Sequence, residues 1–78
     1  MKRGDLIEIP KSWYSFSVAA DNETSIGVFI RYLSDHEIMV LMGPPSVHQY
    51  PTIYEAIIDG RVHTIGGNRE PKILNEAG

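Results

Sequence analysis

The predicted fold depends on the stretch Ile26-Gly-Val-Phe-Ile-Arg-Tyr-Leu33, Ser34-Asp-His-Glu37 and Ile38-Met-Val-Leu-Met42. Two apolar runs, rich in β-branched and aromatic residues, flank four polar residues, which is typical of a β-hairpin. Asp35 and His36 are the predicted central turn residues, because both residue types tolerate the positive φ of a type I′ turn. The sequence therefore predicts that this hairpin nucleates the core.

The predicted register divides the hairpin into two faces. The face expected in the core consists of Val28, Ile30, Tyr32, Met39 and Leu41. The other face carries Arg31 and five apolar residues, which we predict as binding residues: Phe29, Leu33, Ile38, Val40 and Met42. A soluble antiparallel sheet normally alternates apolar and polar residues, so a second face with one charge is unusual. We expect it either to pack on the other half of the fold or to form an interface.

Three further strands and a closing segment are expected outside this hairpin. Residues 4–9 form a short strand that Pro10 ends, with Ile7 and Ile9 facing inward. Residues 53–65 form a second hairpin around Asp59-Gly60, in which Ile57 faces Val62, Ala56 faces His63, Glu55 faces Thr64 and Tyr54 faces Ile65. Residues 66–68 form a turn, and residues 72–74 form a closing strand or a single helical turn. Residues 75–78 are expected to fray.

The fold expected from these elements is a single all-β domain over residues 1–78, with five strands and no helix. The chain has no cysteine, which excludes disulfides and thiolate metal sites and suits a reducing compartment. An isolated hairpin is marginally stable in water, whereas five strands can close a small barrel and cover their edges. Residues 11–25 are predicted as a long loop with partial strand character, and residues 46–51 as an extended connection.

Three segments, in order, resemble a known family. They are Lys2-Arg-Gly-Asp-Leu-Ile7, Gly27-Val-Phe-Ile30, and Tyr54-Glu-Ala-Ile-Ile-Asp-Gly-Arg-Val-His-Thr-Ile65 with Lys72-Ile-Leu74 after it. This pattern is similar to that of the small SH3-like barrel proteins of tailed bacteriophages, notably cyanophages, although residues 10–25 and 43–52 are longer than in the plain versions. The resemblance implies a five-stranded SH3-like barrel of viral origin, and a viral protein of this kind would be expected in the host cytoplasm. It carries no catalytic residue over to this chain.

Catalytic, metal and cofactor sites are not predicted. His36, His48 and His63 match no pattern that places two metal ligands on one face, and no G-x-S-x-G nucleophile motif occurs. The net charge is −3 and the seven Lys and Arg residues are scattered, so nucleic-acid binding is not favoured. If it does occur, the basic residues should cluster in space: Lys2, Arg3, Lys11, Arg31, Arg61 and Arg69. No apolar run reaches the roughly 20 residues that span a bilayer, and no signal peptide is visible, so a cytoplasmic protein without membrane contact is expected.

Aromatic residues are the remaining candidates for binding: Trp13, Tyr14, Phe16, Tyr50 and Tyr54. Aromatics on the long loops of a small barrel can form a groove for an extended peptide, or they can plug the open ends of the barrel. The function predicted from the sequence is a non-enzymatic interaction module that binds a protein partner or itself. A nucleic-acid-binding barrel and a minor virion component are the alternatives.

Overall fold

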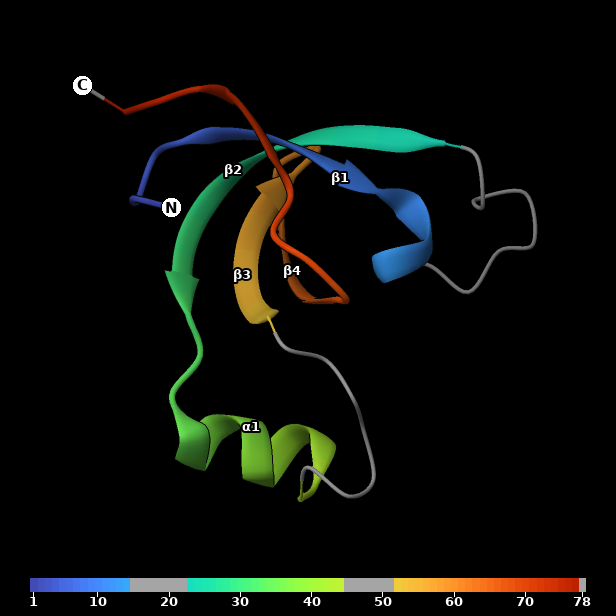
Figure 1. The fold of residues 1–78 in the computed structure, drawn as a ribbon, viewed down its shortest axis with the longest axis vertical. Helices are drawn as coiled ribbons and strands as arrows, with labels where there is room; N and C mark the ends of the chain where they lie inside the picture. The colour runs from blue at the N-terminus through green and yellow to red at the C-terminus, as the bar shows by residue number, and fades with distance from the viewer. Residues whose placement is uncertain (15–22, 45–51, 78) are drawn as a thin grey trace.

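Five antiparallel strands form one sheet in the computed structural model, which describes residues 1–14, 23–44 and 52–77 (Figure 1). The elements in chain order are β1 (Leu6–Pro10), the 3-10 helix η1 (Lys11–Trp13), β2 (Thr24–Tyr32), α1 (Asp35–Met42), β3 (Thr52–Ile58), β4 (Arg61–Gly67) and β5 (Lys72–Asn75). The strand order across the sheet is β4-β3-β2-β1-β5. The prediction of a small, mostly β fold is therefore confirmed, whereas the expected absence of a helix is wrong, because α1 stands where residues 38–42 were predicted as a strand.

Strand β2 belongs to both halves of the sheet. Its first part, Thr24 to Val28, pairs with β1, and its second part, Val28 to Tyr32, pairs with β3. The register shifts between Phe29 and Arg31, and Figure 1 shows that the strand bends strongly along its length. A bulge of this kind increases the bend of a strand, which lets one strand turn the corner of the sheet. The edge strands β4 and β5 do not pair with each other, so the sheet is not closed.

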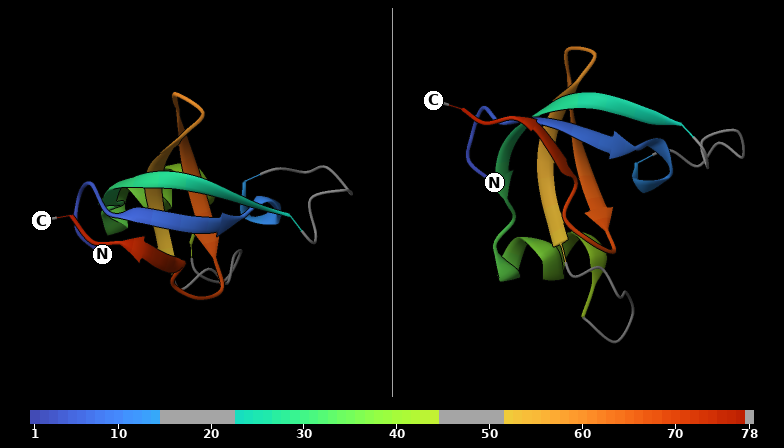
Figure 2. Two further views of the ribbon diagram at one scale, coloured as in Figure 1. Left: turned by 90° about the horizontal axis from the view of Figure 1, so that it is seen from above. Right: turned by 45° about the horizontal axis from the view of Figure 1, so that its top comes forward.

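The second hairpin forms as predicted, and Figure 2 shows its tip rising from the sheet. Asp59 and Gly60 have φ values of 53° and 77°, as a type I′ turn requires. The four predicted pairs across this hairpin are all present: Ile57 with Val62, Ala56 with His63, Glu55 with Thr64, and Tyr54 with Ile65. The turn residues were therefore sufficient to predict the register of β3 and β4.

The central hairpin does not form: its first strand is present as part of β2, but the prediction of residues 38–42 as a second strand is wrong. After β2 the chain enters α1, which begins at a capping box: the Ser34 side chain accepts a hydrogen bond from Glu37 N, and the Glu37 side chain accepts one from Ser34 N. A capping box satisfies two backbone N–H groups that the start of a helix leaves without partners. The stabilisation from these two hydrogen bonds, together with the helix propensity of Met39, Leu41 and Met42, outweighs the β-pattern of residues 38–42.

The core lies on the side of the sheet opposite to the one predicted for β2. The buried cluster consists of Ile7, Ile9, Phe29, Tyr54, Ala56, Ile58 and Ile65. The inward orientation of Ile7 and Ile9 is confirmed. The core face predicted for the central hairpin is wrong: Val28, Tyr32, Met39 and Leu41 are exposed, and Ile30 is half-buried.

The C-terminal region contains the predicted closing strand, which is β5. Gly66 and Gly67, predicted as a turn, lie within β4 instead. The last residues, expected to fray, are held at Ala77, whose N–H donates to Asp5 Oδ1. Residues 15–22 and 45–51 lie outside the described part of the chain, so most of the first loop and the connection before β3 are not described.

Candidate interaction surface

The predicted loop aromatics that the structure describes pack onto the core. Tyr54 is fully buried, and Trp13 and Tyr14 are half-buried against the core cluster. The Tyr14 hydroxyl hydrogen bonds to Ser25 Oγ, and its ring lies 5.0 Å from the ring of His63. These contacts fit the plug alternative better than an open groove. Phe16 and Tyr50 lie outside the described residues.

Trp13 closes the end of the sheet beside β4. A Cβ atom on Gly67 would lie 2.7 Å from two carbon atoms of the Trp13 ring, so the ring needs a glycine at this position. The guanidinium of Arg69 lies 5.1 Å from the centroid of the same ring, which is within the range of a cation–π contact. The sequence offers no local signal for this contact, because Gly67 and Trp13 are far apart along the chain.

The five apolar residues predicted as an outward face do not share one surface. Phe29 and Leu33 are buried, with 3% and 8% of their surface exposed. Ile38 and Met42 are half-buried on α1, and Val40 is exposed on the same helix. The predicted face is therefore wrong, because it assumed that residues 38–42 form a strand paired with β2.

The outward face of the sheet instead carries an apolar row across four strands. Leu6 pairs with Val28, Val28 pairs with Ile57, and Ile57 pairs with Val62, so all four side chains stand on the same face. The exposed fractions of Val28, Ile57 and Val62 are 36%, 38% and 59%. Ile26, two residues before Val28 on β2, adds a fifth apolar side chain that is 59% exposed. We call Leu6, Ile26, Val28, Ile57 and Val62 the outward row.

Pairs of opposite charge flank the outward row on both sides. Glu8 is opposite Lys72 on one side, and Arg31 is opposite Glu55 on the other, where Arg31 Nε donates a 2.8 Å hydrogen bond to Glu55 Oε1. Each flank thus holds one cation and one anion. The outward row is therefore an apolar centre with a balanced polar rim.

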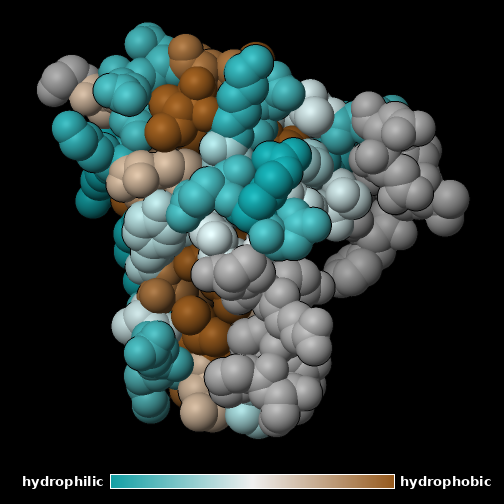
Figure 3. Space-filling model, viewed as in Figure 1, coloured by the Kyte–Doolittle hydropathy of each residue, from teal (hydrophilic) through white to brown (hydrophobic). Residues whose placement is uncertain are grey.

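Hydrophobic surface is visible in two places in Figure 3. One brown area lies where β1, β2 and β5 come together, and another lies between the sheet and α1, with a hydrophilic band between them. On α1, the side chains of Met39, Val40 and Leu41 are 53–69% exposed, and no residue of the helix is buried. The helix is therefore a second apolar surface, separate from the outward row.

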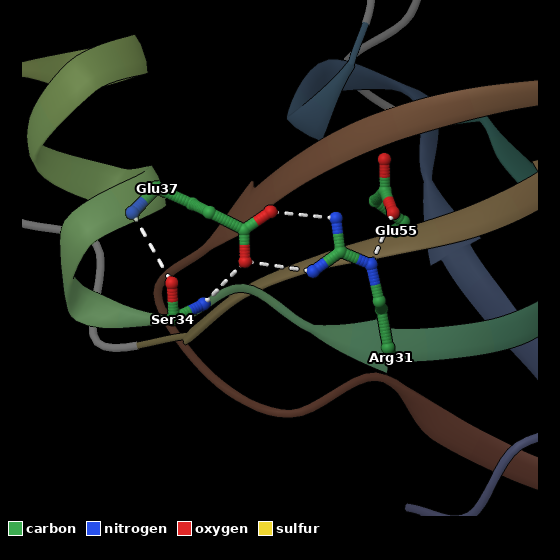
Figure 4. Close-up of polar contacts among 4 residues, drawn as sticks. All are labelled: Arg31, Ser34, Glu37 and Glu55. Atoms are coloured by element: carbon green, nitrogen blue, oxygen red, sulfur yellow. Dashed lines mark hydrogen bonds and ion pairs between the residues drawn. The ribbon is translucent and has the colours of Figure 1, made fainter.

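The contact that fixes α1 to the sheet is polar and centres on Arg31 (Figure 4). The two terminal nitrogens of Arg31 each donate a 2.7 Å hydrogen bond to Glu37, while Nε is bound to Glu55. This paired contact, with the hydrogen bonds of Ser34, lowers the pKa of the Glu37 carboxyl to about 2. The arrangement supports the helix and leaves no free reactive group, so we assign it a structural role.

The charged groups of the described residues offer no metal site, and two of the basic residues are engaged in ion pairs. Among the described residues, no three His, Asp or Glu residues converge as metal ligands. Of the six basic residues expected to cluster if nucleic acid binds, Lys11 is bound to Glu23 and Arg31 to Glu37 and Glu55. None of the described helices is long and apolar enough to cross a membrane.

Three residues that were not predicted from the sequence are structurally important. Ser34 and Glu37 form the S-x-x-E pattern of a capping box, so the signal for α1 was present in the sequence. Asp5 is buried, and its carboxylate accepts hydrogen bonds from Lys2 N at 2.8 Å and Ala77 N at 2.7 Å. These two hydrogen bonds hold the pKa of Asp5 below its ordinary value.

Comparisons of the chain with protein-family models, with curated proteins and with solved structures gave no match.

Proposed function

We propose that this chain is a non-enzymatic interaction module of the SH3-like barrel type, which binds a protein through the outward row of its sheet. The observation that carries the proposal is the continuity of that row. Five apolar side chains lie on registered positions of four adjacent strands, and four of them are 36–59% exposed. Contiguous apolar patches with a polar rim mark interaction sites on soluble domains.

The barrel type is supported by the sheet topology. A meander of four antiparallel strands with β5 added beside β1, in which a bent β2 is shared by the two halves, is the arrangement expected of an SH3-like fold. The open edge between β4 and β5 and the helix between β2 and β3 are departures from the plain barrel. The origin in a tailed phage and the host cytoplasm as the site of action stay predictions from the three sequence segments.

The first partner to test is a second copy of the chain. Small domains without disulfides or metals often gain stability by association, and this chain has no cysteine. Sedimentation velocity over micromolar concentrations should show association of the wild type and its loss in an Ile57→Thr, Val62→Thr variant. Threonine keeps the β-propensity of these two strand positions and removes apolar surface.

A matched control is Val40→Thr, which changes an exposed apolar residue on α1, outside the outward row. This variant should associate like the wild type. If the wild type is strictly monomeric, the same three proteins serve as baits for affinity capture, and the partner should be lost only with the Ile57→Thr, Val62→Thr bait. The proposal would be contradicted if the wild type is monomeric and the Ile57→Thr, Val62→Thr bait captures the same proteins as the wild-type bait.

A further inference from the structure

Strand β5 is attached to the molecule mainly by backbone pairing, and none of its side chains is fully buried. All four of its residues, Lys72 to Asn75, are exposed. The strand pairs with β1 alone, and the register shifts between Leu6 and Ile7, so the ladder is also interrupted. The hydrogen bond from Ala77 N to Asp5 Oδ1 fixes the far end of the segment. Residues 72–77 therefore form a strap across the edge of β1.

The segment before the strap is held much more firmly. Arg69 stacks on Trp13, and the Tyr32 hydroxyl donates to the Glu70 carboxylate at 3.2 Å. Pro71 is buried. These side-chain contacts stop at Pro71, and from Lys72 onward the described contacts are those of the β1 ladder and of Asp5. The side-chain contacts before Pro71 give way to backbone pairing after it. The strap can therefore open at Pro71.

Opening of the strap removes hydrogen bonds and uncovers only the partly covered side chains of β5, of which Ile73 and Leu74 are each 39% exposed. Segments with few buried apolar contacts open at a lower free energy than the whole domain. The opening leaves the edge of β1 with unpaired backbone groups, and such an edge takes up another strand readily. The same segment of a second copy can make every contact that the strap makes in its own chain, including the one with Asp5.

We propose that residues 72–77 are an exchangeable strap, which opens at Pro71 and is replaced on the edge of β1 by the strap of a second copy of this chain. The inference is independent of the outward row, because it uses the edge of the sheet and not its outer face. Exchange competes with a tethered strand whose effective concentration is on the order of mM. Exchange is therefore expected at protein concentrations that approach this value.

The test uses the absence of cysteine in the chain. Glu8 and Lys72 are directly opposite each other in β1 and β5. Opposite Cβ atoms in an antiparallel pair are about 4.5–5.5 Å apart, close to the separation that a disulfide bridges. A full-length Glu8→Cys chain is mixed with a full-length Lys72→Cys chain under native conditions with oxidised glutathione, and mixed disulfide dimers are counted by mass spectrometry.

The matched control pairs the Glu8→Cys chain with a Thr64→Cys chain, because Thr64 is exposed on β4, away from β1. Exchange predicts that the Glu8→Cys and Lys72→Cys pair cross-links at least about tenfold faster than the control pair, since pairing in trans raises the local concentration of the two thiols. A single chain with both cysteines should form the internal disulfide, which shows that the geometry allows the bond. Equal rates for the two pairs would overturn the proposal.

The Ile57→Thr, Val62→Thr background should leave the rates unchanged, which separates this test from that of the outward row.

Discussion

The backbone N–H of Ala77 donates a 2.7 Å hydrogen bond to Oδ1 of Asp5, 72 positions earlier in the chain. The other carboxylate oxygen of Asp5 accepts from Lys2 N at 2.8 Å, so one side chain ties both ends of the described chain. Gly4 has a φ of 95°, and a Cβ atom there would lie 3.2 Å from the Cβ of Ala77. Gly4 and Asp5, in the segment Lys2–Ile7, thus hold the N-terminal residues against Ala77, and this structural role needs no ligand.

Replacement of Asp5 by Asn should destabilise the fold and loosen the C-terminal strap first. The two hydrogen bonds hold the pKa of Asp5 below its ordinary value, so the charged form is the one that they stabilise. Its contribution is fully present above the unfolded pKa of about 3.9 and is lost as the pH falls through the lower folded pKa. At pH 7 we expect a fall in Tm on the order of 5 °C, and a difference from the wild type that shrinks below pH 4.

Asp59→Asn is the control for the loss of one carboxylate, because asparagine also suits the positive φ of the hairpin turn. Its Tm should stay close to that of the wild type across the same pH range. Hydrogen exchange adds a local readout: the amides of residues 73–77 should exchange faster in Asp5→Asn while those of β3 keep their protection. Unchanged exchange at Ala77 would argue against the role assigned to Asp5.

Gly67→Ala should destabilise the domain by about 1–3 kcal/mol, the usual cost of overpacking. The added methyl group would lie 2.7 Å from the Trp13 ring and 3.0 Å from the Arg69 carbonyl oxygen, so the ring must move. Urea unfolding measures the loss, and the fluorescence of Trp13, the single tryptophan of the chain, reports its displacement. In a Trp13→Ala background the same change should cost clearly less, because the ring is gone. An equal cost in both backgrounds would show that the ring is not the obstacle.

Arg31→Gln should release α1 without unfolding the sheet. The wild-type pKa of Glu37 is about 2, so its contact with Arg31 is fully formed above the unfolded pKa of about 4.3 and is lost as the pH falls through about 2. Without Arg31 the acid midpoint of the α1 amide signals, followed by NMR, should rise toward the ordinary carboxyl value. Arg61→Gln removes an exposed cation on β4 and should leave this midpoint unchanged. If the midpoint does not move in Arg31→Gln, Ser34 alone sets the pKa of Glu37.

The contrast between the two predicted hairpins shows what the sequence can specify. Asp59-Gly60 fixes two positive φ values, and this local requirement determines the register of β3 and β4 without help from the rest of the fold. Asp35 and His36 carry no such requirement. The β-pattern around them competed with a capping box at Ser34 and Glu37, and the helix formed because the box satisfies the backbone locally.

The candidate surface was harder to predict than the fold, because exposure depends on the face that each strand buries. A shift of one residue exchanges the two faces of a strand. The bend of β2 and its two partners place Phe29 inward and Val28 outward, and nothing within residues 26–33 distinguishes these possibilities. The outward row therefore became visible only through the pairing of β2 with β1 and β3.

Tyr54→Phe should leave the fold intact and raise its stability. Tyr54 is fully buried, and its hydroxyl is the one buried side-chain N or O atom in the described residues without a hydrogen-bond partner. A buried polar group without a partner costs about 1–3 kcal/mol, so its removal should raise the free energy of unfolding by an amount of that order. The matched control is Tyr32→Phe, which removes a hydroxyl that donates to Glu70 at 3.2 Å and should lower stability. Urea unfolding of both variants decides the question. A loss of stability in Tyr54→Phe would show that the hydroxyl has a partner in solution, for which a buried water molecule is the simplest candidate.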